Sequence, residues 1–330
     1  MTELTMSTSR PARWPISPDR RFWRNNPPLA FCGAVMVVVL LATLVGILID
    51  PRQVLNEPAW LKPAKFAISI AIYTFTLLWL MTFIQGRRRV VAIASWAIAA
   101  TLVFEQAMIS YQAMRGVRSH FNQATAFDVM LWQWMTIAII ILWLASLAVA
   151  ILLLRQRFAN PVMAWALRFG IIIGLVGMLV AVMMPQATPA QSESLRTTDR
   201  SDHIGAHSVG VEDGGPGLPI VGWSTVGGDL RVPHFVGLHA LQGMPIIGWL
   251  LLRIAAPWLT LSDRARLTVI AGLGGLGLVG LLTWQALRGQ SLVAPDRLTG
   301  LVFLSGVVVL GVAAAAVLLS ARRRLAHDHA

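Results

Sequence analysis

Charged residues are scarce in this chain of 330 residues, and their scarcity excludes an ordinary water-soluble domain. Only 13% of the residues are charged, whereas 56% are hydrophobic and the mean hydropathy is +0.67. Soluble domains contain about a quarter charged residues. The net charge of +12 is divided among short basic clusters between long apolar runs. This distribution is typical of anchors against anionic lipid headgroups and argues against a nucleic-acid partner.

The sequence also lacks the motifs that would indicate a particular chemistry. Its single cysteine, Cys32, lies within an apolar run, which excludes an intrachain disulfide and a Cys-x-x-Cys motif. There is no phosphate-binding Gly-Lys motif, no Gly-x-Ser-x-Gly and no His-Glu-x-x-His. No clear cleavage site follows the first apolar run, so we interpret that run as a retained anchor.

Long apolar runs are what the sequence does contain. A helix needs about 20 apolar residues to cross the hydrocarbon core, and lipid offers no partner to a free backbone amide. The predicted spans are residues 29–49, 64–84, 90–112, 129–153, 164–184, 233–253, 268–288 and 300–320. The predicted fold class is therefore an all-α integral membrane protein with eight transmembrane helices.

The distribution of lysine and arginine predicts the orientation of these spans. The amino-terminal segment, alternate loops with the span ends beside them, and the carboxyl tail together hold 17 of the 27 basic residues but only four of the 15 acidic ones. Basic residues accumulate on the cytoplasmic side of membrane proteins. Both termini are therefore predicted to be cytoplasmic, in a protein of the cell membrane.

The predicted organisation has two four-helix halves and a cap. A basic segment, 1–28, precedes the first half, 29–153, and the second half, 154–320, precedes a tail, 321–330. The connection 185–232 is polar and rich in Gly, Pro, Ser, Thr and Asp, and a connection of this length is typically a lid or a mobile segment. We expect an extracytoplasmic cap that is folded over 203–232 and flexible over 187–200.

A weak internal repeat relates the two halves. Asn-Pro precedes the first and fifth spans at positions 26–27 and 160–161. The third span ends in Gln-Ala-Met-Arg-Gly (112–116) and the seventh in Gln-Ala-Leu-Arg-Gly (285–289). Because four spans restore the orientation of the chain, such a repeat implies an axis along the membrane normal. The alternative is that basic loops and apolar runs resemble one another without a repeat.

Two spans carry polar residues that are costly in a membrane and therefore indicate a functional site. Glu105 is the only carboxylate deep inside a predicted span, about 10 Å from its outer end, and Gln112 lies on the same helical face. Beyond it a polar run reaches the outer surface and includes Arg115, Arg118, His120 and Asn122.

The sixth span repeats this pattern. It has Arg231 and His234 at its outer mouth, with His239 and Gln242 deeper in the helix. His234 and His239 are rotated by about 140° around a regular helix. The two imidazoles are therefore not expected to face one ligand unless the helix starts late or is distorted.

The preferred functional hypothesis is a metal or haem site at the outer end, used in redox or cofactor handling. Imidazole and carboxylate groups bind transition metals and haem iron. The candidate ligands are His120, His234 and His239, with Glu105 as a buried acid or proton relay. The residues expected to hold an anionic group or other parts of a ligand are Gln112, Arg115, Arg118, Asn122, Arg231 and Gln242.

Two other functions remain open from the sequence. Glu105 is the proton-carrying group of a transporter in one, and in the other it pairs with an arginine or histidine and merely locks helices together in a scaffold. The plan of the chain is similar in layout to haem A synthase-like membrane oxidoreductases. Their Glu-x-x-His motif is absent, however, and the second, fourth and eighth predicted spans contain no histidine.

Overall fold

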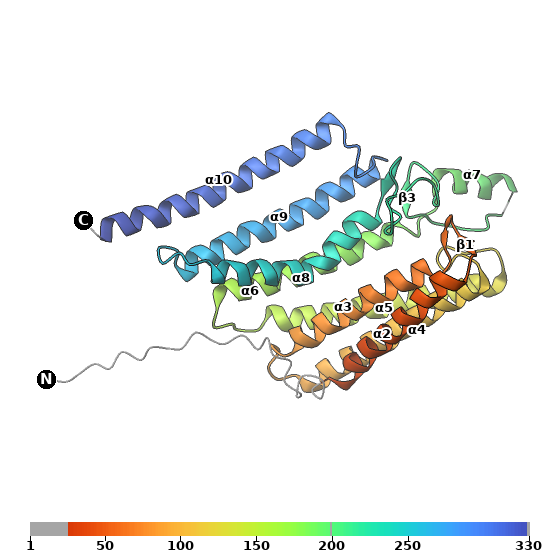
Figure 1. The fold of residues 1–330 in the computed structure, drawn as a ribbon, viewed down its shortest axis with the longest axis horizontal. Helices are drawn as coiled ribbons and strands as arrows, with labels where there is room; N and C mark the ends of the chain where they lie inside the picture. The colour runs from red at the N-terminus through yellow and green to blue at the C-terminus, as the bar shows by residue number, and fades with distance from the viewer. Residues whose placement is uncertain (1–25, 199, 329–330) are drawn as a thin grey trace.

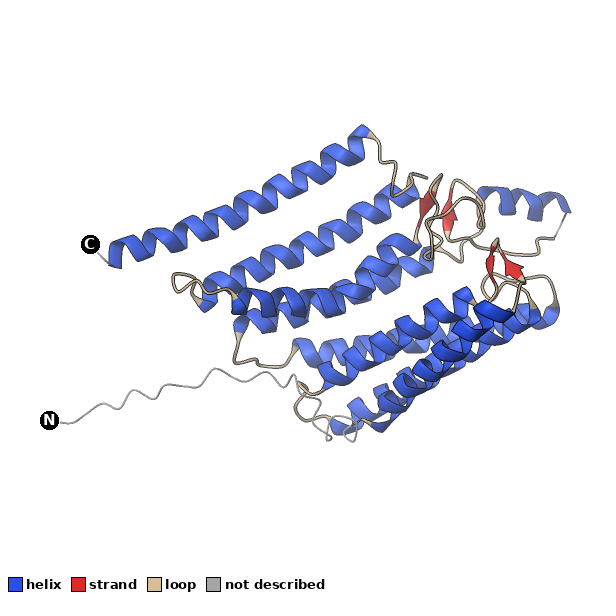
Figure 2. Cartoon of the chain, in the orientation of Figure 1, coloured by secondary structure: helices blue, strands red, loops and turns tan. Residues whose placement is uncertain are grey.

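A computed structural model describes residues 26–198 and 200–328. This part of the chain contains nine α-helices, one 3-10 helix and four strands of two residues each. Eight of the helices are long and apolar enough to cross a membrane, and Figures 1 and 2 show them side by side. The predicted all-α multi-pass fold is confirmed. The basic segment predicted for 1–28 lies almost entirely outside the described residues.

Each predicted span corresponds to one helix, with ends that differ by a few residues. The helices are α2 (Pro27–Ile49), α3 (Leu61–Met81), α4 (Arg88–Arg115), α5 (Ala126–Leu154), α6 (Pro161–Val180), α8 (Arg231–Arg253), α9 (Leu261–Leu287) and α10 (Arg297–Asp328). A 3-10 turn, η1 (Ala181–Met183), extends α6. Helix α10 continues past the predicted end at 320, where Arg324 of its last turns forms an ion pair of 2.6 Å with Asp263 of α9.

The two halves begin in the same way. The side chains of Asn26 and Asn160 accept backbone hydrogen bonds from the first turns of α2 and α6, and a proline follows each asparagine. Asparagine satisfies free amides at a helix start, and proline at the next position has no amide to satisfy. The Asn-Pro pairs therefore explain why both helices begin where they do.

Helices α2 to α5 form one bundle, and α6, α8, α9 and α10 form the other (Figure 1). In the first bundle α2 packs on α3 and α4, and α4 packs on α5. In the second, α6 packs on α8 and α9, and α9 packs on α10. The two bundles meet mainly through α5 and α6. This order of packing suits the predicted internal repeat, which remains a prediction.

The backbones of α6 and α8 approach each other closely where the two helices cross. A Cβ atom added to Gly237 would lie 2.5 Å from the Cα atom of Gly177, and one added to Gly177 would lie 2.7 Å from the Cα atom of Gly237. Small residues permit such backbone contact between membrane helices, which associate through close packing. These two glycines therefore fix how closely α6 and α8 pack.

We expect Gly237→Ala to lower the free energy of unfolding by about 1–3 kcal/mol, because the added methyl group overpacks the crossing. Gly243→Ala, on the same helix, is the matched control, since a Cβ atom there meets nothing within 4 Å. Thermal unfolding of both variants in detergent measures the difference. Equal stability of the two variants would contradict the assigned crossing.

A cap covers one end of the helices, at the right in Figure 1. It contains the hairpin β1 (Gln53–Val54) and β2 (Glu57–Pro58), helix α7 (Pro189–Thr198), and the paired strands β3 (Ser208–Val209) and β4 (Gly228–Asp229). We call this the capped end. The opposite end, which carries the α3–α4 turn, the α8–α9 connection and the last turn of α10, is the arginine-rich end.

The expectation of a flexible segment over 187–200 does not agree with helix α7. Thr188 and Gln191 exchange hydrogen bonds of 3.0 and 3.3 Å at the start of this helix. The buried amide of Gln191 also donates to the carbonyl of Gly205 and accepts from its amide. These bonds tie α7 to the rest of the cap, which the composition of the segment does not reveal.

Candidate functional site

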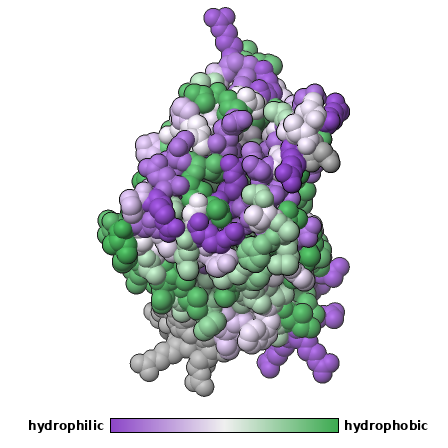
Figure 3. All heavy atoms as spheres, turned by 90° about the vertical axis from the view of Figure 1, so that its right-hand side faces the viewer, coloured by the Kyte–Doolittle hydropathy of each residue, from purple (hydrophilic) through white to green (hydrophobic). Residues whose placement is uncertain are grey.

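The cap is bonded to both halves of the protein. Asn56, in the β1–β2 hairpin, donates to the carbonyl of Gly214 at 2.8 Å, and the α4–α5 connection forms backbone bonds to Asp202 and Ile204. On the other half, a Cβ atom at Gly228 would collide with the carbonyl oxygen of Ala286 in α9. Figure 3 shows hydrophilic residues gathered over this face of the molecule. The cap thus encloses polar groups from both halves.

Lys62 lies at the centre of these enclosed groups. It is in the first turn of α3, and its ammonium group interacts electrostatically with Glu57, Lys65, Glu105, His120, His207, Asp213 and Arg231. Among the described residues, Lys62 has no hydrogen bond and no ion pair. We call Lys62, Glu105, His120, His207 and Asp213 the capped cluster.

The neighbouring cations are paired, in contrast to Lys62. Lys65 forms an ion pair of 2.9 Å with Glu57 at the foot of the cap. Arg231 forms one of 2.6 Å with Asp229, whose side chain is fully buried, and donates to the carbonyl of Gly222. Arg231 therefore fastens the cap to α8, and its charge is already compensated.

Glu105 is the buried acid of the capped cluster. Glu105 is 1% exposed, and neither of its carboxyl oxygens has a hydrogen-bond partner among the described residues. The next residue, Gln106, donates to the carbonyl of Pro63, which follows Lys62 in α3. This bond holds α4 against the first turn of α3. The scaffold hypothesis predicted that Glu105 pairs with an arginine or histidine. The described part of the chain contains no such ion pair.

His120 is enclosed by aromatic rings. Its ring centroid lies 5.3 Å from that of Trp132 and 5.6 Å from that of Phe66, and its Nδ1 atom is 3.0 Å from the hydroxyl of Ser119. Burial, together with the nearby charge of Lys62, lowers the pKa of His120 well below its usual value. The imidazole is therefore neutral at pH 7.

His207 and Asp213 form a hydrogen-bonded pair within the cap. The Nδ1 atom of His207 lies 2.7 Å from one carboxyl oxygen of Asp213. The other oxygen of this carboxylate accepts hydrogen bonds from the backbone amides of His207 and Ser208. Burial favours a raised pKa for Asp213, but these donors outweigh it and hold the pKa well below the usual range. Burial and the charge of Lys62 lower the pKa of His207 despite the carboxylate. A neutral His207 thus donates to an ionised Asp213.

Three residues predicted to bind a ligand instead satisfy groups within the protein. Gln112 and Arg115 both donate to Asp128 of α5, and Arg115 also donates to the carbonyl oxygen of the Gln112 side chain at 2.6 Å. Asn122 accepts from the amide of Ala124 and donates to the carbonyl of Arg118. They hold α4, α5 and their connection together.

Arg118 differs from Arg115. Its side chain is half-buried, and it has no ion pair among the residues that the structure describes. Its charge acts on His203 of the cap, whose pKa is lowered by burial first and by Arg118 second. Arg118 therefore remains a candidate contact for an anion.

The predicted metal set of His120, His234 and His239 is not assembled. His234 donates from Nδ1 to the carbonyl of Gly177 in α6, at 2.8 Å, whereas Nδ1 of His239 lies 3.2 Å from the amide oxygen of Gln242. The two rings have different partners, because His234 bonds to α6 whereas His239 contacts Gln242 and Phe235 of its own helix. Within 26–198 and 200–328, no three His, Cys, Asp or Glu side chains are grouped as metal ligands.

Gln242 contributes instead to the contact between the halves, whereas His239 contacts a ring of its own helix. Gln242 donates to the hydroxyl of Thr76 in α3 at 2.8 Å, and the ring of His239 lies 4.1 Å from that of Phe235. Interhelical hydrogen bonds of this kind contribute modestly to the association of membrane helices. This contact lies on a different face of α8 from His234.

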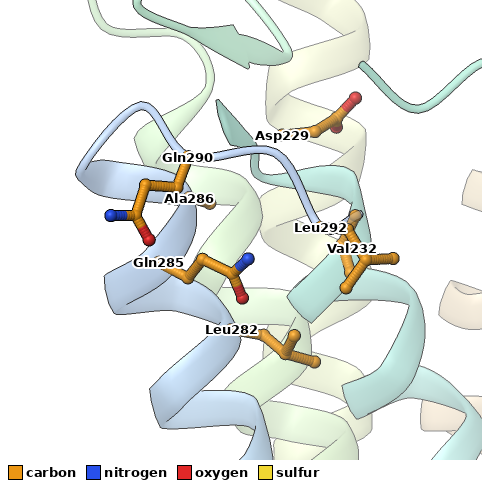
Figure 4. Close-up of a pocket in the computed structure, with 7 residues that line it drawn as sticks. All are labelled: Asp229, Val232, Leu282, Gln285, Ala286, Gln290 and Leu292. Atoms are coloured by element: carbon orange, nitrogen blue, oxygen red, sulfur yellow. The ribbon is translucent and has the colours of Figure 1, made fainter. Parts of the chain in front are cut away.

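A cavity below β4 is too small to be the site. Its volume is about 10 Å³, and its lining comes from α8, α9 and the connection that follows α9 (Figure 4). Gln285, in this lining, is satisfied by the carbonyl of Ser291 at 2.7 Å. Such a space is about the size of one water molecule.

No family model, no curated protein and no solved structure matches this chain. The assignment of a site therefore depends on the geometry of the chain itself. Lys62, His207 and Asp213 are the three residues of the capped cluster that were not among the predicted site residues. In the sequence, Lys62 lies near the predicted outer mouth together with several other cations. This position alone does not show which of these cations lacks a partner.

Protonation of His120 is expected to destabilise the folded protein. The pKa of His120 is near 6.5 in the unfolded chain and lower in the folded one. The contribution of His120 to the free energy of unfolding is therefore complete above about pH 6.5. It is lost as the pH falls below that value towards the pKa of the folded protein. Thermal unfolding between pH 7.5 and 5 should show a shallower loss of stability in His120→Gln. An unchanged slope would show that the imidazole is not enclosed.

Proposed function

We propose that the protein is a proton-coupled membrane carrier of a small organic or inorganic anion. In this proposal Lys62 binds the anionic group beneath the cap, and Glu105 takes up and releases the coupling proton. The capped end faces the outside of the cell, as the distribution of basic residues predicts. Arg118 provides a second cation at the edge of the site.

One observation carries the proposal: a buried carboxyl group and a lysine act on each other, and neither has a bonded partner in the part of the chain that the structure describes. An ionisable group inside a membrane protein is normally paired unless it has a function. An unpaired buried charge is costly. An anion bound to Lys62 removes the compensating charge that acts on Glu105, and protonation of Glu105 becomes more favourable. Anion binding and proton uptake are coupled for this reason.

The arrangement of the two halves supports movement of the site between the two sides of the membrane. The halves meet mainly through α5 and α6, and the Gln242–Thr76 hydrogen bond joins them at α8 and α3. The capped cluster takes Lys62 and Glu105 from the first half and His207 and Asp213 from the cap. Carriers with two halves commonly move by rocking one against the other around a central site.

The observed donors do not favour the metal or haem function that the sequence predicted. His234 and His239 use their Nδ1 atoms in contacts with different groups, and neither faces His120. His207 has the carboxylate partner that is common behind metal-binding histidines. One such histidine beside His120 does not complete a ligand set among the described residues.

Lys62→Gln is expected to weaken anion binding by about tenfold or more, because a charge-assisted hydrogen bond contributes about 1.5–3 kcal/mol. Acetate, succinate and inorganic phosphate are the probes, and the rise of the thermal unfolding temperature with anion concentration is the measurement. Arg196→Gln, on the exposed face of α7, is the charge-matched control. If none of the probes stabilises the wild type, or if both variants respond alike, Lys62 is not the anion-binding residue.

Glu105→Gln is expected to abolish accumulation of the anion driven by a pH gradient. Glutamine preserves the size of the side chain but carries no exchangeable acidic proton. In proteoliposomes the variant should retain exchange of labelled for unlabelled anion, while uptake driven by external acid falls to the level of empty liposomes. Glu193→Gln, exposed on α7, is the control. Normal acid-driven uptake by Glu105→Gln would exclude the proposed proton role.

A further inference from the structure

A second candidate binding site lies far from the capped cluster, towards the arginine-rich end. A groove of about 600 Å³ runs between α6, α9 and α10. Its volume lies within the range of about 300–1,000 Å³ that is usual for ligand sites. The residues that line the groove include Trp165, Ser262, Ala265, Arg266, Ala313 and Val317. Because Ala265 and Ala313 have short side chains, they leave space between larger neighbours.

The groove is apolar along its length and positively charged near its mouth. The side chain of Arg266 is 61% exposed, and its nearest carboxyl oxygen, on Asp263, is 3.9 Å away. The other oxygen of Asp263 is already bonded to Arg324 at 2.6 Å. The guanidinium group of Arg266 therefore retains most of its capacity to bind an anion.

The residues beside the mouth are typical of the boundary between hydrocarbon and headgroups. Trp165 is partly exposed, and the guanidinium group of Arg168 lies 5.5 Å from its ring centroid. Tryptophan and arginine concentrate at this depth of a membrane. Ser262 is exposed at the start of α9 and provides a hydroxyl group.

The groove opens towards the region that lipid occupies. Helix α10 packs mainly on α9, and no residue in its most apolar stretch is buried. An apolar groove in this position is filled by acyl chains in a bilayer. From the combination of apolar trough and free guanidinium group, we infer that the groove binds one membrane phospholipid with an anionic headgroup. One acyl chain lies between α6, α9 and α10, and the phosphate contacts Arg266.

Charge complementarity favours this occupant over a second copy of the chain or a partner helix. A transmembrane helix is about 10 Å across and needs an apolar face along the whole span, whereas this groove is confined to the turns near one end. Near that end the second copy would bring its own arginines against Arg266. An anionic headgroup meets the guanidinium group without such repulsion.

The test compares two pairs of variants of the full chain in nanodiscs. Val317→Phe fills the groove, and Val309→Phe, exposed elsewhere on α10, is its control. Arg266→Gln removes the cation, and Arg155→Gln, an exposed arginine in the α5–α6 connection, is its control. The probes are dioleoylphosphatidylglycerol and dioleoylphosphatidylcholine, and native mass spectrometry after release from the nanodisc counts the retained lipids.

We expect one tightly retained phosphatidylglycerol in the wild type and both controls, and its loss in Val317→Phe. Arg266→Gln should bind it about fivefold more weakly, because each cation near anionic lipid contributes roughly 1 kcal/mol. Equal retention by Val317→Phe and Val309→Phe would overturn the site. Equal retention of the two lipids would overturn the headgroup assignment. A dimer that Val317→Phe alone disrupts would show that a second copy fills the groove.

Discussion

The cost of leaving a polar group unpaired in an apolar environment underlies the whole structure. It forces the backbone into helices wherever the chain crosses the membrane, and it gathers most polar side chains at the two ends. At the capped end, Asp128, Asp213 and Asp229 each accept several hydrogen bonds. These three carboxylates hold the helix ends and the cap in place. The requirement that polar groups be paired therefore shapes the cap as well as the membrane-spanning helices.

Two residues of the capped cluster, Lys62 and Glu105, depart from this pairing of polar groups, and the departure indicates a function. Arg115, Arg231 and Lys65 have carboxylate partners, whereas Lys62 and Glu105 act on each other without forming a bond. A protein that needed only stability would gain from pairing or replacing them. Glu105 is buried and Lys62 is half-buried, so a bound anion or a gained proton changes their energies more than it would in water. The proposal of proton-coupled anion binding rests on this imbalance.

The parts of the site that the sequence indicated correctly are those set by position along one helix. Glu105 is buried in α4, and His234 and His239 have different partners, as their spacing on α8 predicted. Arg115 and Arg231, which were predicted to hold an anionic group, each have an aspartate partner that the sequence analysis did not predict. Their carboxylate partners became known only from the packing, since Asp128 lies on the next helix and Asp229 is turned back by the cap.

The sequence by itself determined the eight spans, their order and the Asn-Pro starts of α2 and α6. Span length, capping and hydropathy are local properties, and the bilayer imposes the same thickness on every helix. Only the tertiary structure decided that α7 forms, that Lys62 has no partner within 26–198 and 200–328, and that the three predicted metal-binding histidines are separated. Those outcomes depend on which helix faces meet and on which donors reach which acceptors, and contacts between distant segments cannot be obtained from local patterns.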